Sequence, residues 1–320
     1  YGFSHTHLSG TGVSDYGDIL LMPTNKVVFN NGADGKEGYR AHFSHENEIA
    51  EPGYYKVSLD TTNIEVELTV TERSGIHKYL FPSTENQFLM IDLDHRDQLL
   101  SAGLEMVSNT EIKGHRHSKA WAEDQRLFFR LKSSHTFKGQ NKDLKHPNKL
   151  VLEFDNPDNE PVFIKIGISA VDEAGALKNL EQEIGSSSFE DVKTAAQNTW
   201  EKQLEKIVVE STNEDYKTVF YTSMYHSMIA PNIYQDVDGR YRGMDLNIHE
   251  NKDHINYSVF SLWDTYRAAH PLYTIIEQDK TNDFINTFLA KYDEGGIMPM
   301  WDLSGNYTDC MIGYHAVPVV

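Results

Sequence analysis

The chain has 320 residues, of which 39% are hydrophobic and 24% charged, and this composition fits a globular protein with room for two domains. Its 29 basic and 48 acidic residues give a net charge of −19, which argues against nucleic acid or an anionic membrane as a partner. No apolar run approaches the roughly 20 residues of a membrane span, and no signal peptide is visible. The single cysteine, Cys310, excludes an intrachain disulfide and is expected to be a small buried residue rather than a nucleophile.

The first segment, residues 1–23, is rich in Gly, Ser and His, and this excludes a regular helix. His5 and His7 stand two residues apart, so in an extended chain their imidazoles point to the same side. Such a pair could bind a metal ion or a sugar hydroxyl, or it could hold a structural turn through hydrogen bonds.

Residues 39–170 carry the pattern of strands. Segments 54–59 and 63–70 alternate apolar and polar residues, with a turn at Asp60–Thr62 between them. Further strands are expected at 77–81, 88–93, 112–117, 126–131, 150–154 and 162–170. Turn-rich segments, such as 139–143 and 156–159, separate them. Many strands without intervening helices predict an antiparallel β-sandwich.

The pattern changes to helices near residue 172. Helices are expected at 173–184, 189–207, 216–230 and 281–292, the last ended by Gly295-Gly296, with a further helix beginning near Cys310. The segments 233–256 and 299–308 are expected to be loops, and Asp236–Gly239 a surface turn. We therefore predict a β-sandwich domain over 1–171, a helical linker over 172–211 and a mostly helical domain over 212–320, which the family resemblance described below implies is incomplete.

The stretch 259–271 places charged residues on an otherwise apolar helix. Helical spacing puts one set of side chains on a single face, with Asp264 beside them: Phe260, Trp263, Arg267 and His270. One interpretation is an Asp264–Arg267 ion pair that supports the helix. The other is a binding site, since charges in such surroundings mark functional sites.

The loop at 299–308 combines an aromatic ring, a carboxylate and an amide in Trp301, Asp302 and Asn306. These groups could stack on a polyol and hydrogen-bond it, or they could stabilise the loop through Asx turns.

Several blocks of the sequence resemble glycoside hydrolase family 92, the calcium-dependent exo-acting α-mannosidases. The blocks follow the family's order and are 2–12 (GFSHTHLSGTG), 43–48 (FSHENE), 52–55 (PGYY), 236–245 (DVDGRYRGMD), 263–267 (WDTYR) and 310–315 (CMIGYH). The resemblance implies an N-terminal antiparallel β-sandwich (a supersandwich), a helical linker and the start of an (α/α)6 toroid. It also implies a secreted, periplasmic or cell-surface protein that hydrolyses terminal α-linked mannose from mannans or N-glycans, with inversion and with help from Ca²⁺.

Family 92 enzymes carry their acid in a Glu-Gly-Asn motif and their base later still, and neither motif is found here. We therefore assign no catalytic residue in this chain, expect the acid, the base and the principal Ca²⁺ ligands beyond Val320, and interpret the chain as an internal piece of such an enzyme. The resemblance implies substrate contacts by Asp264, Trp263, Arg267, Trp301, Asn306, His5 and His7. Two alternatives are a non-catalytic carbohydrate-binding module and a family member that cleaves mannose-phosphate-mannose linkages.

Overall fold

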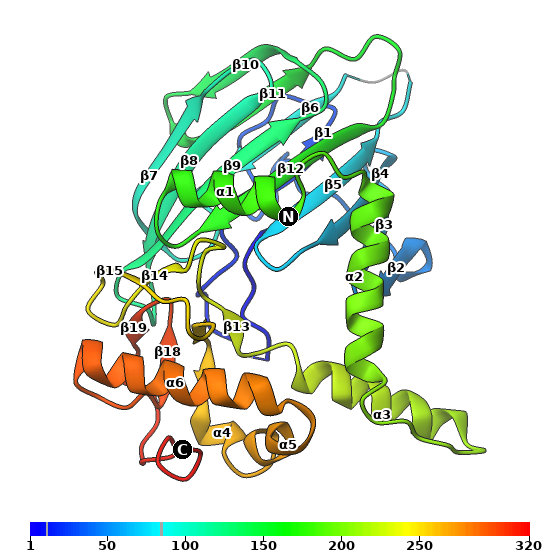
Figure 1. The fold of residues 1–320 in the computed structure, drawn as a ribbon. Helices are drawn as coiled ribbons and strands as arrows, with labels where there is room; N and C mark the ends of the chain where they lie inside the picture. Colours follow the sequence, from blue (N-terminus) through cyan, green and yellow to red (C-terminus); the bar gives the residue numbers. More distant parts are fainter. Residues whose placement is uncertain (11, 84–85) are drawn as a thin grey trace.

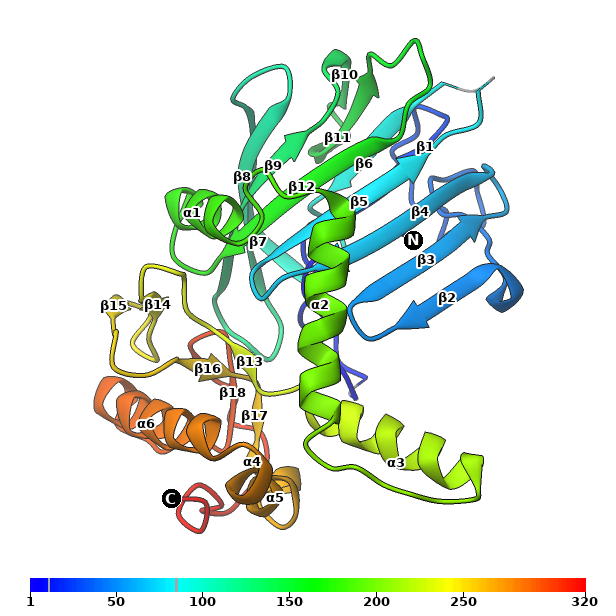
Figure 2. The same cartoon turned by 45° about the vertical axis from the view of Figure 1, so that its right-hand side comes forward.

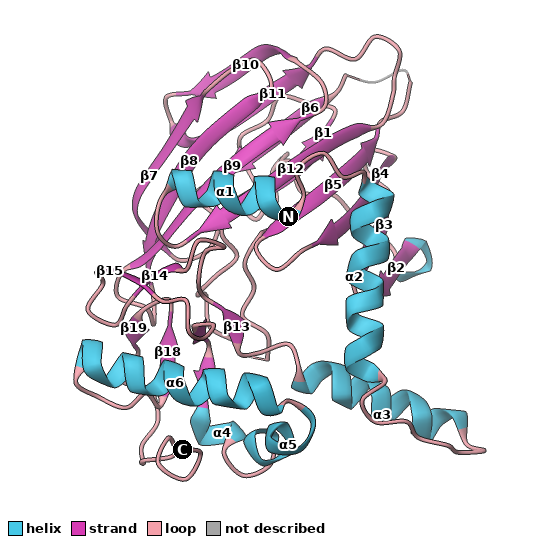
Figure 3. Cartoon of the chain, viewed as in Figure 1, coloured by secondary structure: helices cyan, strands magenta, loops and turns pink. Residues whose placement is uncertain are grey.

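A computed structural model describes residues 1–10, 12–83 and 86–320 of the chain. Thr11, within the first sequence block, lies outside this description. A two-sheet β-structure forms one half of the molecule, and a smaller body of helices and short strands forms the other (Figures 1 and 3). This arrangement confirms the predicted antiparallel sandwich followed by helices. No helix in the described ranges is long and apolar enough to cross a membrane.

The sandwich consists of an eight-stranded and a four-stranded sheet, in which every pair of neighbouring strands is antiparallel. The larger sheet has the strand order β2 (Glu48–Glu51), β3 (Tyr54–Leu59), β4 (Ile64–Val70), β5 (Ser74–Leu80), β12 (Val162–Ser169), β9 (Gln125–Ser133), β8 (Glu111–Lys119) and β7 (Gln98–Met106). The smaller sheet has the order β1 (Leu20–Thr24), β6 (Phe88–Asp92), β11 (His146–Phe154) and β10 (Phe137–Asp143).

The core between the sheets explains why the alternating segments fold as strands. On β4, Ile64 and Val66 are fully buried, whereas the intervening Glu65 is half-buried. Burying such a side chain stabilises the fold by about 1.5–3 kcal/mol, and the period of two directs the apolar residues of β4 to one face, where all but the terminal Val70 are buried or partly buried. All eight strands expected between 54 and 170 are present.

Four strands, namely β1, β2, β7 and β10, were not predicted, and residues 139–143, expected to be a turn, lie in β10. Each of the four stands at an edge of its sheet. Three of them, β2, β7 and β10, carry polar or irregular sequences, as edge strands often do because one side has no strand to pair with. β1 is different, since its five residues are all buried and therefore show no alternation. In β10, Lys138, Gln140 and Lys142 are exposed, so no apolar alternation marks the strand.

The helices that follow the sandwich match the prediction closely. α1 (Glu173–Glu183) packs against β12 and β9, and α2 (Phe189–Leu204) packs across β3, β4 and β5. Ser188 and Asp191 form a capping box at the start of α2. α3 (Glu214–Ser227) extends from the end of α2 away from the sandwich (Figure 2). A short 3-10 helix, η1 (His45–Asn47), precedes β2.

The last third of the chain differs from the prediction in four segments, two expected to be helical and two expected to be loops. The helix expected over 259–271 is divided into β17 (Phe260–Ser261), α4 (Leu262–Thr265) and α5 (Ala269–Ile276). Pairing of β17 with a later strand keeps Phe260 and Ser261 extended. Pro271 explains the break between α4 and α5, since its ring nitrogen cannot donate to the Arg267 carbonyl of a continuous helix but is tolerated in the first turn of α5. Residues 310–320 form turns rather than a helix, and Cys310 is only partly buried.

α6 (Gln278–Gly295) ends at Gly296, which has the left-handed conformation, as the pair Gly295-Gly296 predicted. The two expected loops, 233–256 and 299–308, contain short strands. These strands form three small sheets: β13 (Asn232–Ile233) with β16 (Tyr257–Ser258), β14 (Arg240–Arg242) with β15 (Ile248–Glu250), and β17 with β18 (Trp301–Leu303) and β19 (Asn306–Tyr307). The turn at Asp236–Gly239 is present, but Asp236 is 5% exposed and therefore not at the surface.

Candidate functional site

Two of the predicted site residues, Trp263 and Asp264, lie on the exposed side of α4. Trp263 is 44% exposed, and Asp264 is also exposed. Among the described residues the hydrogen-bond partner of Asp264 is the Ser261 hydroxyl, which donates to Oδ2. The alternative Asp264–Arg267 ion pair does not form within the described chain. Arg267 instead donates from Nε to the hydroxyl of Tyr266 over 2.8 Å. The Asp264 carboxylate is therefore available to an external ligand.

Two of the sequence blocks meet at this surface. The ring of Tyr266 stacks on that of His315, with centroids 4.1 Å apart and planes inclined by 3°. The Arg267 guanidinium carbon lies 5.3 Å from the centroid of the Tyr266 ring. We call Trp263, Asp264, Tyr266, Arg267 and His315 the α4 surface. It offers aromatic faces, a carboxylate and a guanidinium, which together suit a hydroxylated ring.

A buried ion pair fixes the point at which α4 begins. Asp302 on β18 is fully buried and accepts hydrogen bonds from Lys291 Nζ and, over 2.9 Å, from Ser258 Oγ. Burial lowers the pKa of Lys291, and the Asp302 charge opposes that shift. Phe260 on β17 pairs with Asp302, and Leu262 donates its N–H to the Met300 carbonyl over 3.0 Å. The first residue of α4 is thus tied to a strand that is anchored from α6.

Trp301 and Asn306 lie in the junction with the sandwich rather than on the α4 surface. Trp301 is 4% exposed, and its ring centroid is 5.4 Å from that of Trp121. Asn306 Nδ2 donates to the Asp124 carbonyl over 3.1 Å, and Asn306 Oδ1 accepts from the Asp124 N–H over 3.0 Å. Both side chains therefore hold the two halves of the molecule together, and contact of either with a substrate stays a prediction.

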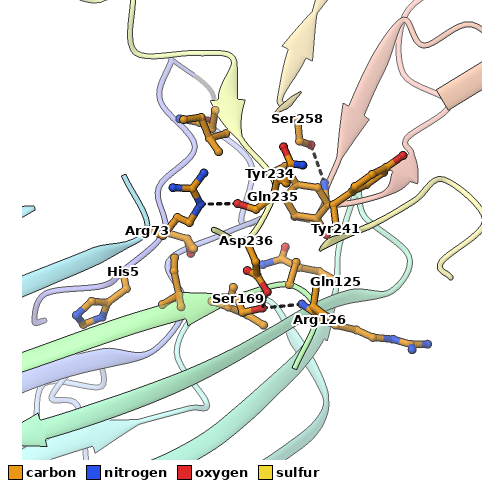
Figure 4. A pocket seen from close by; sticks show the side chains of 18 of the residues that line it. His5, Arg73, Gln125, Arg126, Ser169, Tyr234, Gln235, Asp236, Tyr241 and Ser258 are labelled. Atoms are coloured by element: carbon orange, nitrogen blue, oxygen red, sulfur yellow. Dashed lines mark hydrogen bonds between the residues drawn. The ribbon is translucent and has the colours of Figure 1, made fainter. Parts of the chain in front are cut away.

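His5 and His7 line a separate cavity of about 220 Å³ between the sandwich and the second body (Figure 4). His7 is exposed, whereas both ring nitrogens of His5 have protein partners. Nδ1 lies 2.7 Å from the Ile19 carbonyl, and Nε2 lies 3.0 Å from Nε2 of His77. His77 Nδ1 is in turn 2.7 Å from the Tyr79 hydroxyl. One set of neutral tautomers satisfies this chain of hydrogen bonds, so His5 has a structural role here.

The hydrogen-bonded pair of His5 and His77 predicts that the stability of the protein depends on pH. Burial lowers the pKa of His5 from 6.5 to about 4 and that of His77 well below 6.5. Between these values the unfolded chain binds more protons than the folded one, so the free energy of unfolding falls as pH drops from about 6.5 toward 4. His5→Asn, whose amide can still donate to the Ile19 carbonyl, is expected to reduce this slope by up to about 1.4 kcal/mol per pH unit. Denaturant unfolding at a series of pH values from 7.5 to 4.5 measures this slope for the unmodified chain and the variant.

His7→Asn is the control for this measurement, because His7 belongs to the same segment but is exposed. Its replacement is expected to change the free energy of unfolding by no more than about 0.5 kcal/mol at any pH in the series. Parallel curves for His5→Asn and the unmodified chain would contradict the assignment.

The described residues do not form a calcium site. No group of three or more His, Cys, Asp or Glu side chains among them could hold a metal ion. Ca²⁺ prefers six to eight oxygen ligands, several of them carboxylates, and the α4 surface presents a single carboxylate. The residues of the α4 surface thus do not fit the ion.

Comparison with known protein families shows to which family the chain belongs. The N-terminal domain model of glycosyl hydrolase family 92 matches residues 1–169, and the catalytic domain model of the same family matches residues 175–320. The chain belongs to glycoside hydrolase family 92. A protein of Arthroderma benhamiae described as an uncharacterized secreted glycosidase is 27% identical over 311 residues, which cover 83% of this chain and 39% of that protein.

Solved structures of family 92 agree with the fold. An α-mannosidase of Bacteroides thetaiotaomicron is 36% identical to this family 92 chain, and the two structures superpose with a TM-score of 0.92. The match covers 99% of this chain and 46% of the α-mannosidase chain. A complex of that enzyme with mannoimidazole gives 35% identity and a TM-score of 0.90, over 99% of this chain and 45% of its own. An inverting mannosidase of the same organism is 23% identical, with a TM-score of 0.83 over 94% and 42% of the two chains, and supports the fold alone. The chain spans less than half the length of these relatives.

Sequence reasoning missed two residues of the site region in this family 92 chain and gave a third the wrong role. Tyr266 and His315 lie in two of the sequence blocks that resemble family 92, but only the three-dimensional structure shows that these blocks meet. Asp302 is predicted to hydrogen-bond a polyol or to stabilise a loop, but it is fully buried and paired with Lys291. A carboxylate within the apolar run Met300–Leu303 is a signal for such a buried, paired charge.

Proposed function

We propose that the full-length gene product is a secreted α-mannosidase that removes terminal α-linked mannose from mannans or N-glycans with inversion. The observation that supports this most strongly is the 36% identity and TM-score of 0.92 with an α-mannosidase over 99% of this chain. The complex of that enzyme with mannoimidazole adds support for a mannose-type ligand. The description of a fungal relative as secreted supports the location.

In this proposal the α4 surface binds the terminal mannose. Asp264 accepts hydrogen bonds from sugar hydroxyls, and such charge-assisted bonds are about twice as strong as neutral ones. Trp263 offers an exposed aromatic face on which the apolar side of a sugar ring can pack. Arg267, held beside Tyr266, donates to ring or hydroxyl oxygens on the other side.

Inversion requires more than the α4 surface contains. One carboxylic acid protonates the leaving oxygen while a second carboxylate, about 6.5–9.5 Å away, removes a proton from the attacking water. Asp264 is the one carboxylate of the α4 surface, so we assign to this chain substrate contacts and neither the acid nor the base. Calcium dependence is part of the proposal, without a ligand set in the described residues.

The test is hydrolysis of an α-1,2-linked mannobiose by the full-length gene product. We expect release of mannose, loss of activity with a chelator and recovery when Ca²⁺ is added back. Proton NMR of the first product should show the β-anomer, as inversion requires. Inactivity toward this and other α-mannosides in the presence of Ca²⁺ would refute the proposal. Release of mannose phosphate from a mannose-phosphate-mannose linkage would favour the alternative chemistry within the family.

A further inference from the structure

Ser261 and Asp264 form a pair of side chains at the start of α4. Ser261 directly precedes the helix and is half-buried, and its hydroxyl donates to Asp264 Oδ2. A serine in this position usually caps the helix by accepting a hydrogen bond from a backbone N–H two or three residues further on. In the described chain the Ser261 side chain makes no such capping bond. Its hydroxyl therefore serves the Asp264 carboxylate rather than the backbone of α4.

A Ser–Asp pair with the same spacing begins α2, and it has a different role. The Ser188 hydroxyl accepts from the Asp191 N–H over 3.2 Å, and Asp191 Oδ2 accepts from the Ser188 N–H over 3.0 Å and from its hydroxyl over 2.7 Å. Two backbone donors at the start of α2 are satisfied in this way, which is the function of a capping box. At α4 the described residues form the bond between the side chains without the two backbone bonds. The pair at α4 thus fixes a side chain and not a helix end.

The backbone that carries Ser261 is held in place. β17 pairs with β18, and the register sets Ser261 opposite Trp301. Phe260, the other residue of β17, is 1% exposed. Val259, directly before β17, is 6% exposed and has a φ of 69°, a left-handed conformation that a β-branched residue adopts only where its surroundings impose it. The Ser261 hydroxyl is therefore presented to Asp264 from a fixed point.

The Asp264 side chain depends on this bond for its orientation. It is exposed, and among the described residues Oδ1 has no hydrogen-bond partner. An exposed aspartate without support occupies several rotamers. Binding then has to select one of them, and this selection weakens the affinity for a ligand. The bond from Ser261 fixes the carboxylate in advance and leaves Oδ1 for an external donor.

We propose that Ser261 is a positioning residue, whose hydroxyl holds Asp264 Oδ2 so that Oδ1 accepts a hydrogen bond from the terminal mannose. This inference rests on the proposed function, because it adds a residue to the machinery of the α4 surface. Ser261 itself does not contact the sugar and acts through Asp264 alone. Its hydroxyl is a donor without a charge, so Asp264 keeps its negative charge for a charge-assisted bond to the substrate.

The first test is steady-state hydrolysis of α-1,2-linked mannobiose by the full-length gene product. Ser261→Ala is expected to lower kcat/KM by about 10-fold, as for the loss of one hydrogen bond of ordinary strength. Ser261→Thr keeps the hydroxyl and suits a strand, so its kcat/KM should stay within about threefold of that of the unmodified enzyme. In the Asp264→Ala background, Ser261→Ala should cause no further loss, because the two residues act as one unit.

Ser188→Ala is the matched control, since it removes the serine of the other Ser–Asp pair, far along the chain from the α4 surface. This variant loses a helix cap, so its unfolding temperature should fall by about 1–4 °C while kcat/KM stays within about twofold. Ser261→Ala should show the opposite result, with an unfolding temperature unchanged within about 1 °C. A fall in unfolding temperature equal to that of Ser188→Ala, with kcat/KM unchanged, would make Ser261 an ordinary cap and overturn the proposal.

Crystal structures of the unmodified full-length protein and of its Ser261→Ala variant show the orientation of Asp264 without any substrate. In the variant we expect the carboxylate to leave its place beside residue 261 or to occupy several rotamers. An unchanged Asp264 rotamer would overturn the proposal, and so would an additive loss of kcat/KM in the double variant. If the unmodified enzyme releases no mannose, the proposed function fails, and the two crystal structures still decide the role of Ser261.

Discussion

Asp264→Ala in the full-length gene product is expected to lower kcat/KM for an α-mannoside by about 100-fold or more. A hydrogen bond from a neutral hydroxyl to a charged group contributes about 1.5–3 kcal/mol, and one carboxylate can accept from two hydroxyls. The loss should be close to 3 kcal/mol of transition-state binding. Stability should change by less than about 0.5 kcal/mol, because the side chain is exposed and Ser261 is its partner in the described chain. Steady-state kinetics and thermal unfolding measure the two quantities.

Asp279→Ala provides the matched control. Asp279 is also an exposed aspartate in the first turn of a helix, α6, but it does not belong to the α4 surface. We expect kcat/KM of this variant to stay within about twofold of the unmodified enzyme, as for a surface substitution away from a site. Asp264→Asn separates charge from shape, since it keeps the size of the side chain and removes the strong acceptor. Activity of Asp264→Ala equal to that of the unmodified enzyme would remove Asp264 from the site.

The position of Asp264 depends on residues that the sequence pattern did not indicate. The backbone of β17 is held by β18, and Asp302 on β18 is held by Lys291 from α6. A period of 3.6 residues predicted one long helix here, because Phe260 and Trp263 have helical spacing. Pairing between β17 and β18 overrides that spacing at Phe260, and Pro271 interrupts the helix further on. Tertiary contacts commonly override local patterns in this way.

The strands show which parts of a fold a single sequence reveals. Interior strands such as β4 bury most of one face, so apolar residues recur at every second position and the pattern is visible. The four missed strands are the four edges of the two sheets. β7, for example, has only exposed and half-buried residues over Gln98–Met106, so burial does not impose an apolar pattern there. Prediction succeeds where burial of one face imposes alternation on a strand. It fails where solvent imposes no pattern, as in β7, and where every residue of a short strand is buried, as in β1.

The candidate site shows the same limit for side chains. Trp263, Asp264 and Arg267 lie within five residues, and the chain keeps them on one exposed surface. Trp301 and Asn306 also offer an aromatic ring and a hydrogen-bonding group suited to a sugar, yet both are buried where the second body meets the sandwich. Residue type alone does not separate a sugar-binding amide from one that hydrogen-bonds the backbone of Asp124. That distinction depends on which distant segments of the chain meet, and the spacing of residues in one sequence does not give this information.

Arg116→Met is expected to cause the largest loss of stability in the sandwich, about 3–5 kcal/mol in the free energy of unfolding. Arg116 is fully buried and donates to Asp18 and Asp97, which are also buried, and to the carbonyls of Leu93 and His95, each over 2.9 Å. Removing one partner of a buried ion pair costs this amount because the remaining charge is left without compensation. Here two carboxylates and two carbonyls lose their donor. Chemical denaturation of the purified protein at pH 7.5 measures the loss.

Lys26→Met is the surface control, since Lys26 pairs with Glu37 over 2.9 Å in an exposed position, and we expect a cost below about 1 kcal/mol. The triple variant Arg116→Met, Asp18→Asn, Asp97→Asn distinguishes unpaired charge from lost packing. Desolvation already raises the pKa of Asp97 to about 6 even beside Arg116, so its charge is costly in this environment. Neutralising both carboxylates should therefore recover part of the stability lost in Arg116→Met. A triple variant less stable than Arg116→Met would show that the hydrogen bonds of Asp18 to Thr6 and Gln125, rather than charge balance, dominate this part of the core.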